Sequence, residues 1–253
     1  MKKAFIITSA IEVNNKFPLT YSDKRSFFNT EERLRQTVMT LASLDGLCDK
    51  DTYYYVLDVS NEWHSFAELL HYQKNLRFIS VKERFPEIFE QVTTHPHKTV
   101  CESTILATFM RNYRAELSQY DFVFKMTGRY FLDSSFDTSI FTEANKNKIF
   151  YKRPLEFEWK DEWNYHMVDR RREQGTNTLR QYCSVLFGWG QSHYDHFLDM
   201  FTAVPSILKQ PAYSHLDIET FGHYFTRPYE SDIIETGWLV YGWDGATGRF
   251  WRY

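Results

Sequence analysis

The sequence predicts an α/β protein built on a mostly parallel sheet with helices on both faces, followed by a less regular C-terminal region. In the first half, strand-like segments alternate with helical ones, which is the order of a parallel sheet with helical crossovers. The strand-like segments are almost continuously apolar, as strands covered on both faces are. Several of them end in hydroxyl or charged residues, and ligands of such sheets bind outside the carboxyl ends of the strands.

The first half supplies the regular part of this fold. Strands are expected at 4–10, 52–60, 76–81 and 121–126, where β-branched and aromatic residues are frequent. Helices are expected at 29–47, 65–73 and 101–120, and the segments 12–29 and 82–100 are interpreted as loops.

The helix at 29–47 has recognisable ends. Asn29 or Thr30 caps it, and Glu31 and Glu32 lie in its first turn, where the positive end of the helix dipole favours acidic side chains. Gly46 is expected to end the helix. Its buried face is predicted from helical spacing to consist of Leu34, Val38, Leu41 and Ala42.

The second half is less regular. Strands are expected at 147–154 and 182–190, helices at 192–204 and 216–225, and the tail has strand character followed by a glycine-rich turn. The sequence shows no repeat and no convincing linker, so residues 1–253 are predicted to form one domain with two sub-regions, 1–140 and 141–253.

Composition excludes several classes of protein. The chain has 30 basic and 33 acidic residues, whereas nucleic-acid-binding domains usually carry a basic excess. Its three cysteines are widely spaced and suggest neither a disulfide framework nor a zinc motif, which fits a reduced, cytoplasmic protein. No segment approaches the length of a transmembrane helix, so membrane contact is expected to be peripheral at most. The run 169–173 is interpreted as a solvated turn, or as a contact for a charged acceptor or the inner membrane face.

The segment YDFVFKMTGRYFL (120–132) turns from apolar to polar at the end of a predicted strand. Lys125 and Arg129 flank Thr127 and Gly128. A glycine there allows the backbone to pass close to a ligand, and the two cations suit a phosphate or diphosphate. The alternative is that both cations are surface residues paired with Asp121 or Asp133.

Three carboxylates in the C-terminal region are candidates for a catalytic base. Glu219 is the first choice, Asp217 the second and Asp244, in a glycine-rich turn, the third. A base that takes a proton from a reacting hydroxyl typically accelerates a reaction about 10²–10⁴-fold. The alternative for the first pair is that Asp217 caps a helix and Glu219 is exposed.

Three segments together resemble a group of GT-A-like glycosyltransferases from bacterial surface-polysaccharide gene sets and some large DNA viruses. Residues 125–130 match the pattern K-[ILM]-[ST]-G-R-[YW], and 21–43 match Y-S-x-x-R-S-x-x-x-x-x-E-R-x-x-Q-T-x-x-T-x-x-S. In 97–109, a lysine and a glutamate four residues apart open a helix, as in that group. The resemblance covers roughly residues 1–140, and the C-terminal third matches only loosely.

This resemblance implies a GT-A-like fold and transfer of a sugar from a nucleotide-sugar donor to a glycan or glycolipid acceptor. Residues 1–140 would then bind the donor and 141–253 the acceptor. By the resemblance, Thr8, Ser9 and Asp58 would line the nucleoside pocket and Glu102 would lie beside the diphosphate. The candidates for the diphosphate side are Arg25, Arg33, Lys98, Lys125 and Arg129, with Thr127 and Gly128 between the last two.

One departure from the general GT-A pattern concerns the metal. Those enzymes usually carry Asp-x-Asp at the end of the corresponding strand, whereas this sequence has Lys-Met-Thr-Gly-Arg. We therefore make no firm prediction of a cofactor. A divalent Mg²⁺ or Mn²⁺ ion is disfavoured, because the lysine and arginine side chains would neutralise the leaving diphosphate directly. Two alternatives to a transferase stay open, a sugar nucleotidyltransferase and a non-catalytic carbohydrate-binding or scaffold protein. The first would be expected to have a glycine-rich loop after the first strand, which this sequence lacks.

Overall fold

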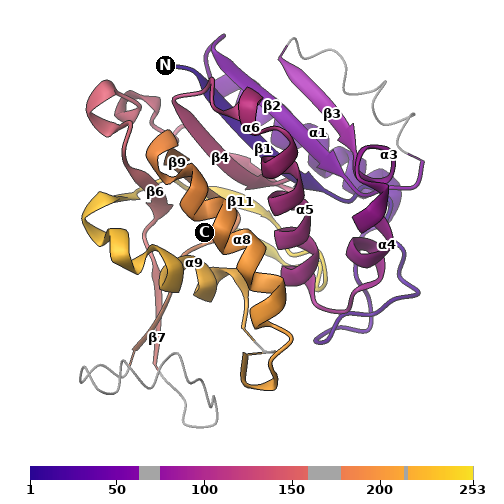
Figure 1. Cartoon of the computed structure of the whole chain (residues 1–253). Helices are drawn as coiled ribbons and strands as arrows, with labels where there is room; N and C mark the ends of the chain where they lie inside the picture. Colours follow the sequence, from indigo (N-terminus) through magenta and orange to yellow (C-terminus); the bar gives the residue numbers. More distant parts are fainter. Residues whose placement is uncertain (63–74, 159–177, 214–215, 253) are drawn as a thin grey trace.

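The computed structural model describes residues 1–62, 75–158, 178–213 and 216–252 of the chain. A seven-stranded sheet lies at the centre of this part (Figure 1). All strands run parallel except β9, which is antiparallel to both of its neighbours. The predicted α/β fold with a mostly parallel sheet is confirmed. In spatial order the strands are β10 (Ile233–Thr236), β6 (Ile149–Lys152), β9 (Leu186–Gly190), β4 (Phe122–Thr127), β1 (Lys3–Ser9), β2 (Thr52–Asp58) and β3 (Leu76–Ser80).

The sheet is covered on both faces, because successive side chains of each strand point to opposite sides. In β1, Ala4 and Ile6 belong to the core under α5 (Lys98–Asn112) and α8 (Tyr194–Ile207). The intervening Phe5 and Ile7 belong to a second core with buried residues of α1 (Thr30–Leu47). Figure 1 shows α5 and α8 side by side in front of the sheet.

Smaller elements complete the described part of the chain. A three-stranded sheet contains β5 (Tyr130–Leu132), β11 (Val240–Trp243) and β12 (Phe250–Arg252), and a two-stranded one contains β7 (Leu155–Glu158) and β8 (Thr178–Gln181). The short helices are α3 (Val81–Arg84), α4 (Pro86–Thr94), α6 (Arg114–Leu117) and α9 (Ile218–Thr226). No helix in the described ranges has both the length and the apolar character needed to cross a bilayer.

Several predicted elements differ from those observed. The expected loop 82–100 contains most of α3, all of α4 and the first turn of α5, because Ser80 caps one helix and Pro86 opens the next. The expected helix 101–120 begins earlier and divides into α5 and α6. The expected helix 65–73 and the run 169–173 lie outside the described residues.

Helix α1 begins as predicted, and its fully buried face includes one of the four predicted residues, Leu41. Asn29 accepts a hydrogen bond from the backbone of Glu32 in a capping box, and the helix continues through Gly46 to Leu47. Ala42 is exposed, contrary to the prediction. The buried face is largely polar and consists of Arg33, Gln36, Thr37, Thr40, Leu41 and Leu44.

This polar face is explained by what it packs against. Helix α1 contacts β5 and the turn before it. The Thr37 hydroxyl donates to the Gly128 carbonyl oxygen at 3.1 Å, and the Ser43 hydroxyl accepts from the Leu132 N–H at 3.1 Å. Hydroxyls are favoured at these positions because buried backbone groups need hydrogen-bond partners. The 21–43 and 125–130 patterns are therefore in direct contact in the folded protein.

Candidate functional site

A cavity of about 820 Å³ lies at the carboxyl ends of β1 and β4. Its walls come from both halves of the chain, because the start of α9 and the turn of the β11–β12 hairpin line it together with β1, β4 and α5. The predicted site residues that line it are Thr8, Ser9, Arg25, Lys98, Glu102, Thr127, Arg129, Asp217, Glu219 and Asp244, and Arg33 lines it as well.

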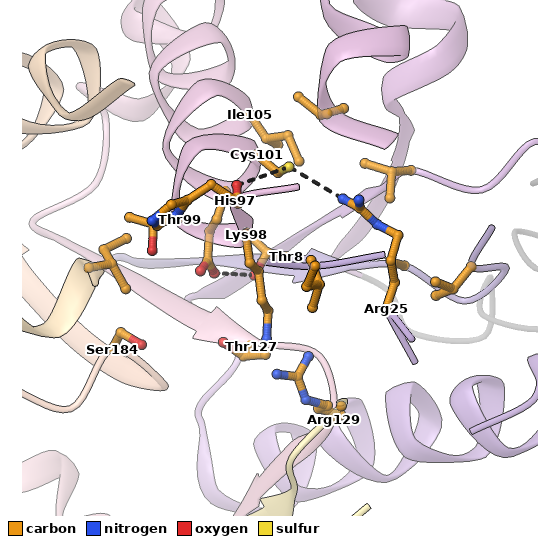
Figure 2. A pocket seen from close by; sticks show the side chains of 18 of the residues that line it. Thr8, Arg25, His97, Lys98, Thr99, Cys101, Ile105, Thr127, Arg129 and Ser184 are labelled. Atoms are coloured by element: carbon orange, nitrogen blue, oxygen red, sulfur yellow. Dashed lines mark hydrogen bonds between the residues drawn. The ribbon is translucent and has the colours of Figure 1, made fainter. Parts of the chain in front are cut away.

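One wall of the cavity carries the cations Arg33, Lys98 and Arg129 from three different elements. Hydrogen bonds fix the two guanidinium groups: Arg33 Nε donates to the Ala10 carbonyl at 2.9 Å, and Arg129 Nε donates to the Trp243 carbonyl at 2.8 Å. Gly245 lies against both groups, since a Cβ there would be 3.3 Å from Arg129 Cζ and 3.3 Å from Arg33 Nη1. Figure 2 shows Lys98 pointing from the start of α5 towards Arg129.

The proximity of these cations changes their acid–base behaviour. Burial and the Arg129 charge lower the pKa of Lys98 to about 7. The same two causes lower the pKa of Arg33 to about 9. Among the described residues, the terminal nitrogens of Arg129 have no acceptor. An anion bound here would relieve the mutual repulsion, so the wall is suited to a phosphate or diphosphate.

Arg25 lines the cavity but is bonded to the protein. Its guanidinium donates to the carbonyl oxygens of Phe17 at 3.3 Å and His95 at 2.9 Å. It also donates to Cys101 Sγ at 3.5 Å, which Figure 2 shows as a dashed line. Arg25 therefore ties the 12–29 loop to the start of α5, a structural role that the sequence did not predict.

Lys125 does not lie on the cavity wall as expected. Its side chain is fully buried under the floor, where Nζ forms an ion pair with Glu102 Oε1 at 2.6 Å. The same ammonium donates to Thr127 Oγ1 at 2.9 Å and to the Ser184 carbonyl at 2.6 Å. The alternative pairing of Lys125 with Asp121 is also wrong, because Asp121 pairs with Lys146.

Asp58 and Gly128 are also absent from the cavity wall. The buried Asp58 carboxylate accepts from the backbone N–H groups of Ile11 at 3.1 Å and Ser60 at 2.8 Å, so it orders the loops behind the wall. Gly128 has ordinary negative φ and approaches β1 rather than a ligand. A Cβ there would lie 3.1 Å from the Thr8 carbonyl oxygen, and its N–H donates to that oxygen at 2.9 Å.

The three candidate bases differ in what their oxygens already bind. Asp217 caps α9, with Oδ1 accepting from the Thr220 N–H at 2.8 Å and Oδ2 from Gln181 at 3.0 Å. Asp244 orders its hairpin turn, where Oδ1 accepts from the Thr247 N–H at 2.7 Å. Hydrogen bonds from Thr247 and the nearby cations hold the pKa of Asp244 below its usual value, against the opposing effect of burial.

Glu219 differs from both because its acidity is strongly shifted. Burial and the neighbouring Asp217 charge raise the pKa of Glu219 to about 7. The Ser184 hydroxyl donates to its Oε1. A carboxyl group that titrates near neutrality inside a cavity can both accept and release a proton.

Three residues of the site were missed from the sequence. Ser184 was counted within a strand, yet it precedes β9 and lies at the cavity because β9 runs antiparallel. Tyr21 lines the cavity from the 12–29 loop, and Thr37 supports Gly128 from α1. The hydroxyl of Ser184 interrupts an otherwise apolar run, which is the signal that the sequence carries for it.

A metal site like that of Asp-x-Asp enzymes does not fit the end of β4. Lys125, Thr127 and Arg129 offer cations and one hydroxyl there, and Mg²⁺ or Mn²⁺ prefers carboxylate oxygens. Nowhere in the described ranges do three histidine, cysteine or acidic side chains gather as metal ligands.

Comparison with known proteins identifies the fold. The chain is similar to the crystal structure of mouse xyloside xylosyltransferase 1 in its apo form, with a TM-score of 0.51 and 12% sequence identity. The similarity covers 93% of this chain and 85% of the other. No family model and no curated protein matches the sequence. The shared feature is thus the fold of a glycosyltransferase.

Proposed function

We propose that the protein is a glycosyltransferase that moves a sugar from a nucleotide-sugar donor to a glycan acceptor, in surface-polysaccharide or glycoconjugate synthesis. One observation carries the proposal: Arg33, Lys98 and Arg129 converge on one cavity at the carboxyl edge of the sheet. That edge is where open α/β folds bind ligands. The fold shared with a xylosyltransferase supports the same class of reaction.

In this proposal the cationic wall binds the donor diphosphate. Thr8 and Ser9 contact the nucleoside, and Arg33, Lys98 and Arg129 contact the phosphates. As the glycosidic bond breaks, negative charge grows on the departing nucleotide, and fixed cations stabilise that charge without reorganising. We propose that transfer is independent of a divalent metal, because these side chains supply the positive charge that a metal would supply.

Glu219 is the proposed base for the acceptor hydroxyl in an inverting reaction. Its raised pKa matches a group that takes up a proton near neutral pH. Glu219→Gln should lower turnover by about 10²–10⁴-fold while donor binding is retained. If the anomeric configuration is retained, an enzymic base is not required and this assignment fails without affecting the donor site.

The donor site is tested by thermal unfolding in the presence of a panel of nucleotide-sugars. A donor at 100 times its Kd should stabilise the fold by about 2.7 kcal/mol. Arg33→Met should abolish this shift, because it removes a cavity cation. Arg35→Met is the matched control on the same helix, since Arg35 is exposed and pairs with Glu31. Each variant is compared with its own unfolding temperature without ligand.

The outcomes separate the alternatives. Stabilisation by glycans but by no nucleotide would indicate a binding or scaffold protein. Turnover of a sugar phosphate with a nucleoside triphosphate would indicate a nucleotidyltransferase. Equal loss of stabilisation in the two arginine variants would contradict the cationic wall as the donor site.

A further inference from the structure

The buried ammonium of Lys125 uses all of its N–H donors within the protein, so none is available to a ligand. An ammonium carries three N–H groups. Those of Lys125 are matched by three acceptors: Glu102 Oε1 at 2.6 Å, Thr127 Oγ1 at 2.9 Å and the Ser184 carbonyl at 2.6 Å. The side chain is fully buried. Lys125 therefore acts on its protein neighbours.

The first of these neighbours, Glu102, is held from two sides. Its Oε1 accepts from Lys125 and from the Thr8 hydroxyl at 2.9 Å. Glu102 itself lines the cavity, and among the described residues its Oε2 has no hydrogen-bond partner. Although burial opposes ionisation, the Lys125 charge lowers the pKa of Glu102. Glu102 thus presents to the cavity an oxygen of a carboxylate that the Lys125 charge stabilises.

The second neighbour, Ser184, links Lys125 to the other carboxylate. The carbonyl oxygen of Ser184 accepts from Lys125, and its hydroxyl donates to Glu219 Oε1. The two oxygens of one residue therefore join the buried cation to the carboxyl group that titrates near neutrality. Ser184 precedes β9, whose pairing with β4 places it beside Thr127.

We propose that Lys125 is a positioning residue that fixes Glu102 directly and Glu219 through Ser184, so that both carboxylates face the same ligand. This proposal rests on the proposed function, because it takes Glu219 to be the base of the transfer reaction. It assigns the two carboxylates different tasks. Glu102 stays ionised beside the donor sugar, where it can stabilise positive charge as the glycosidic bond breaks, and Glu219 exchanges the acceptor proton.

The test is a double-mutant cycle read out by the titration of Glu219. Glutamate side chains are labelled with ¹³C at the carboxyl carbon, and Glu219→Gln assigns the signal. Lys125→Met is always made together with Glu102→Gln, so that neither partner of the buried ion pair is left as an unpaired charge. Lys125→Met should then raise the Glu219 midpoint by about half a pH unit or more, because a hydrogen bond to the ionised form is weakened.

The cycle separates positioning from the direct field of the lysine charge. Ser184→Ala should also raise the Glu219 midpoint. Lys125→Met should cause no further rise once the Ser184 hydroxyl is absent. Lys146→Met, which removes a lysine paired with Asp121, is the control and should leave the midpoint unchanged. An unchanged midpoint after Lys125→Met, or an equal shift with and without the Ser184 hydroxyl, would overturn the proposal.

A second substitution guards against misfolding. Lys125→Arg keeps the charge but moves the donor atoms. The Glu219 midpoint should therefore rise in the protein with Ser184 and stay unchanged in the protein with Ser184→Ala. The titration uses no nucleotide. Its failure would leave the donor-binding experiment intact, and failure of donor binding would leave the linkage between Lys125 and Glu219 intact.

Discussion

At the scale of single residues, the polar groups of the site divide into those that already have hydrogen-bond partners within the protein and those that do not. Lys125, Asp58 and Arg25 use their hydrogen-bonding capacity within the protein. Arg129 keeps its terminal nitrogens for the cavity, and Glu219 keeps a proton near neutral pH. Counting donors and acceptors thus separates supporting residues from residues that face a ligand.

Lys98 gives a residue-scale prediction about pH. Its pKa is about 7 in the free protein, and a bound diphosphate should raise this pKa, so binding takes up a proton. Affinity for a nucleotide-sugar should therefore be greatest below pH 7 and fall as pH rises, by up to about tenfold per unit. Lys98→Met should weaken binding at low pH and flatten this dependence.

Calorimetric titrations between pH 6 and 9 measure both effects. Lys82→Met serves as the control, since Lys82 lies on α3 and is exposed. A wild-type affinity that does not change across this range would contradict the prediction.

At the scale of elements, the sequence predicted the strands of the parallel half well and the site only in part. An apolar run such as 4–10 indicates a buried strand, and the residues of this run do lie in the two cores on either side of the sheet. The direction of β9 is set by long-range pairing with β4, and no local pattern encodes it. That direction brings Ser184 to the cavity. Likewise, the buried polar residues of α1 follow from its contact with β5, and of the residues that apolar spacing selected on this helix only Leu41 is fully buried.

The close contact between Gly128 and β1 gives a prediction at this scale. Gly128→Ala places a methyl group 3.1 Å from the Thr8 carbonyl oxygen and 3.2 Å from Ile7 Cγ2, so the strands must separate slightly. The expected cost is about 1–3 kcal/mol of unfolding free energy. Gly237→Ala is the matched control, because nothing lies within 4 Å of its added methyl group.

Urea denaturation of both variants provides the measurement. The first should unfold at lower urea with an unchanged slope, and the second should not. Equal stability of the two proteins would show that the turn before β5 tolerates a side chain.

At the scale of the whole molecule, the cavity depends on both halves of the chain. Residues 1–140 supply the cationic wall, and α9 and the β11–β12 hairpin supply Glu219 and Asp244. The predicted division at 140 therefore crosses the site. Arg33, Lys98 and Arg129 lie together on one wall of the cavity, whose lining also includes the carboxyl groups of Glu102 and Glu219.

The three cations of this wall lead to the prediction about metals. Sugar transfer, measured with the donor that stabilises the protein, should proceed at the same rate in excess chelator and with added Mn²⁺ or Mg²⁺. Arg129→Met should lose turnover that no metal restores, because the missing charge is part of the protein. Strict dependence on Mn²⁺ would contradict metal-independent transfer.

The loop 12–29 is fastened on both sides of the cavity. Thr20 donates to the Pro96 carbonyl at 3.0 Å, and Phe27 donates to the Gly245 carbonyl at 2.7 Å. Chain segments more than 200 residues apart must therefore meet before the binding wall is finished. Closing a loop of that length costs chain entropy, so the hydrogen bond from Phe27 to Gly245 depends on the pairing that holds β11 against β5. The cavity is therefore completed by contact between early and late segments of the described chain.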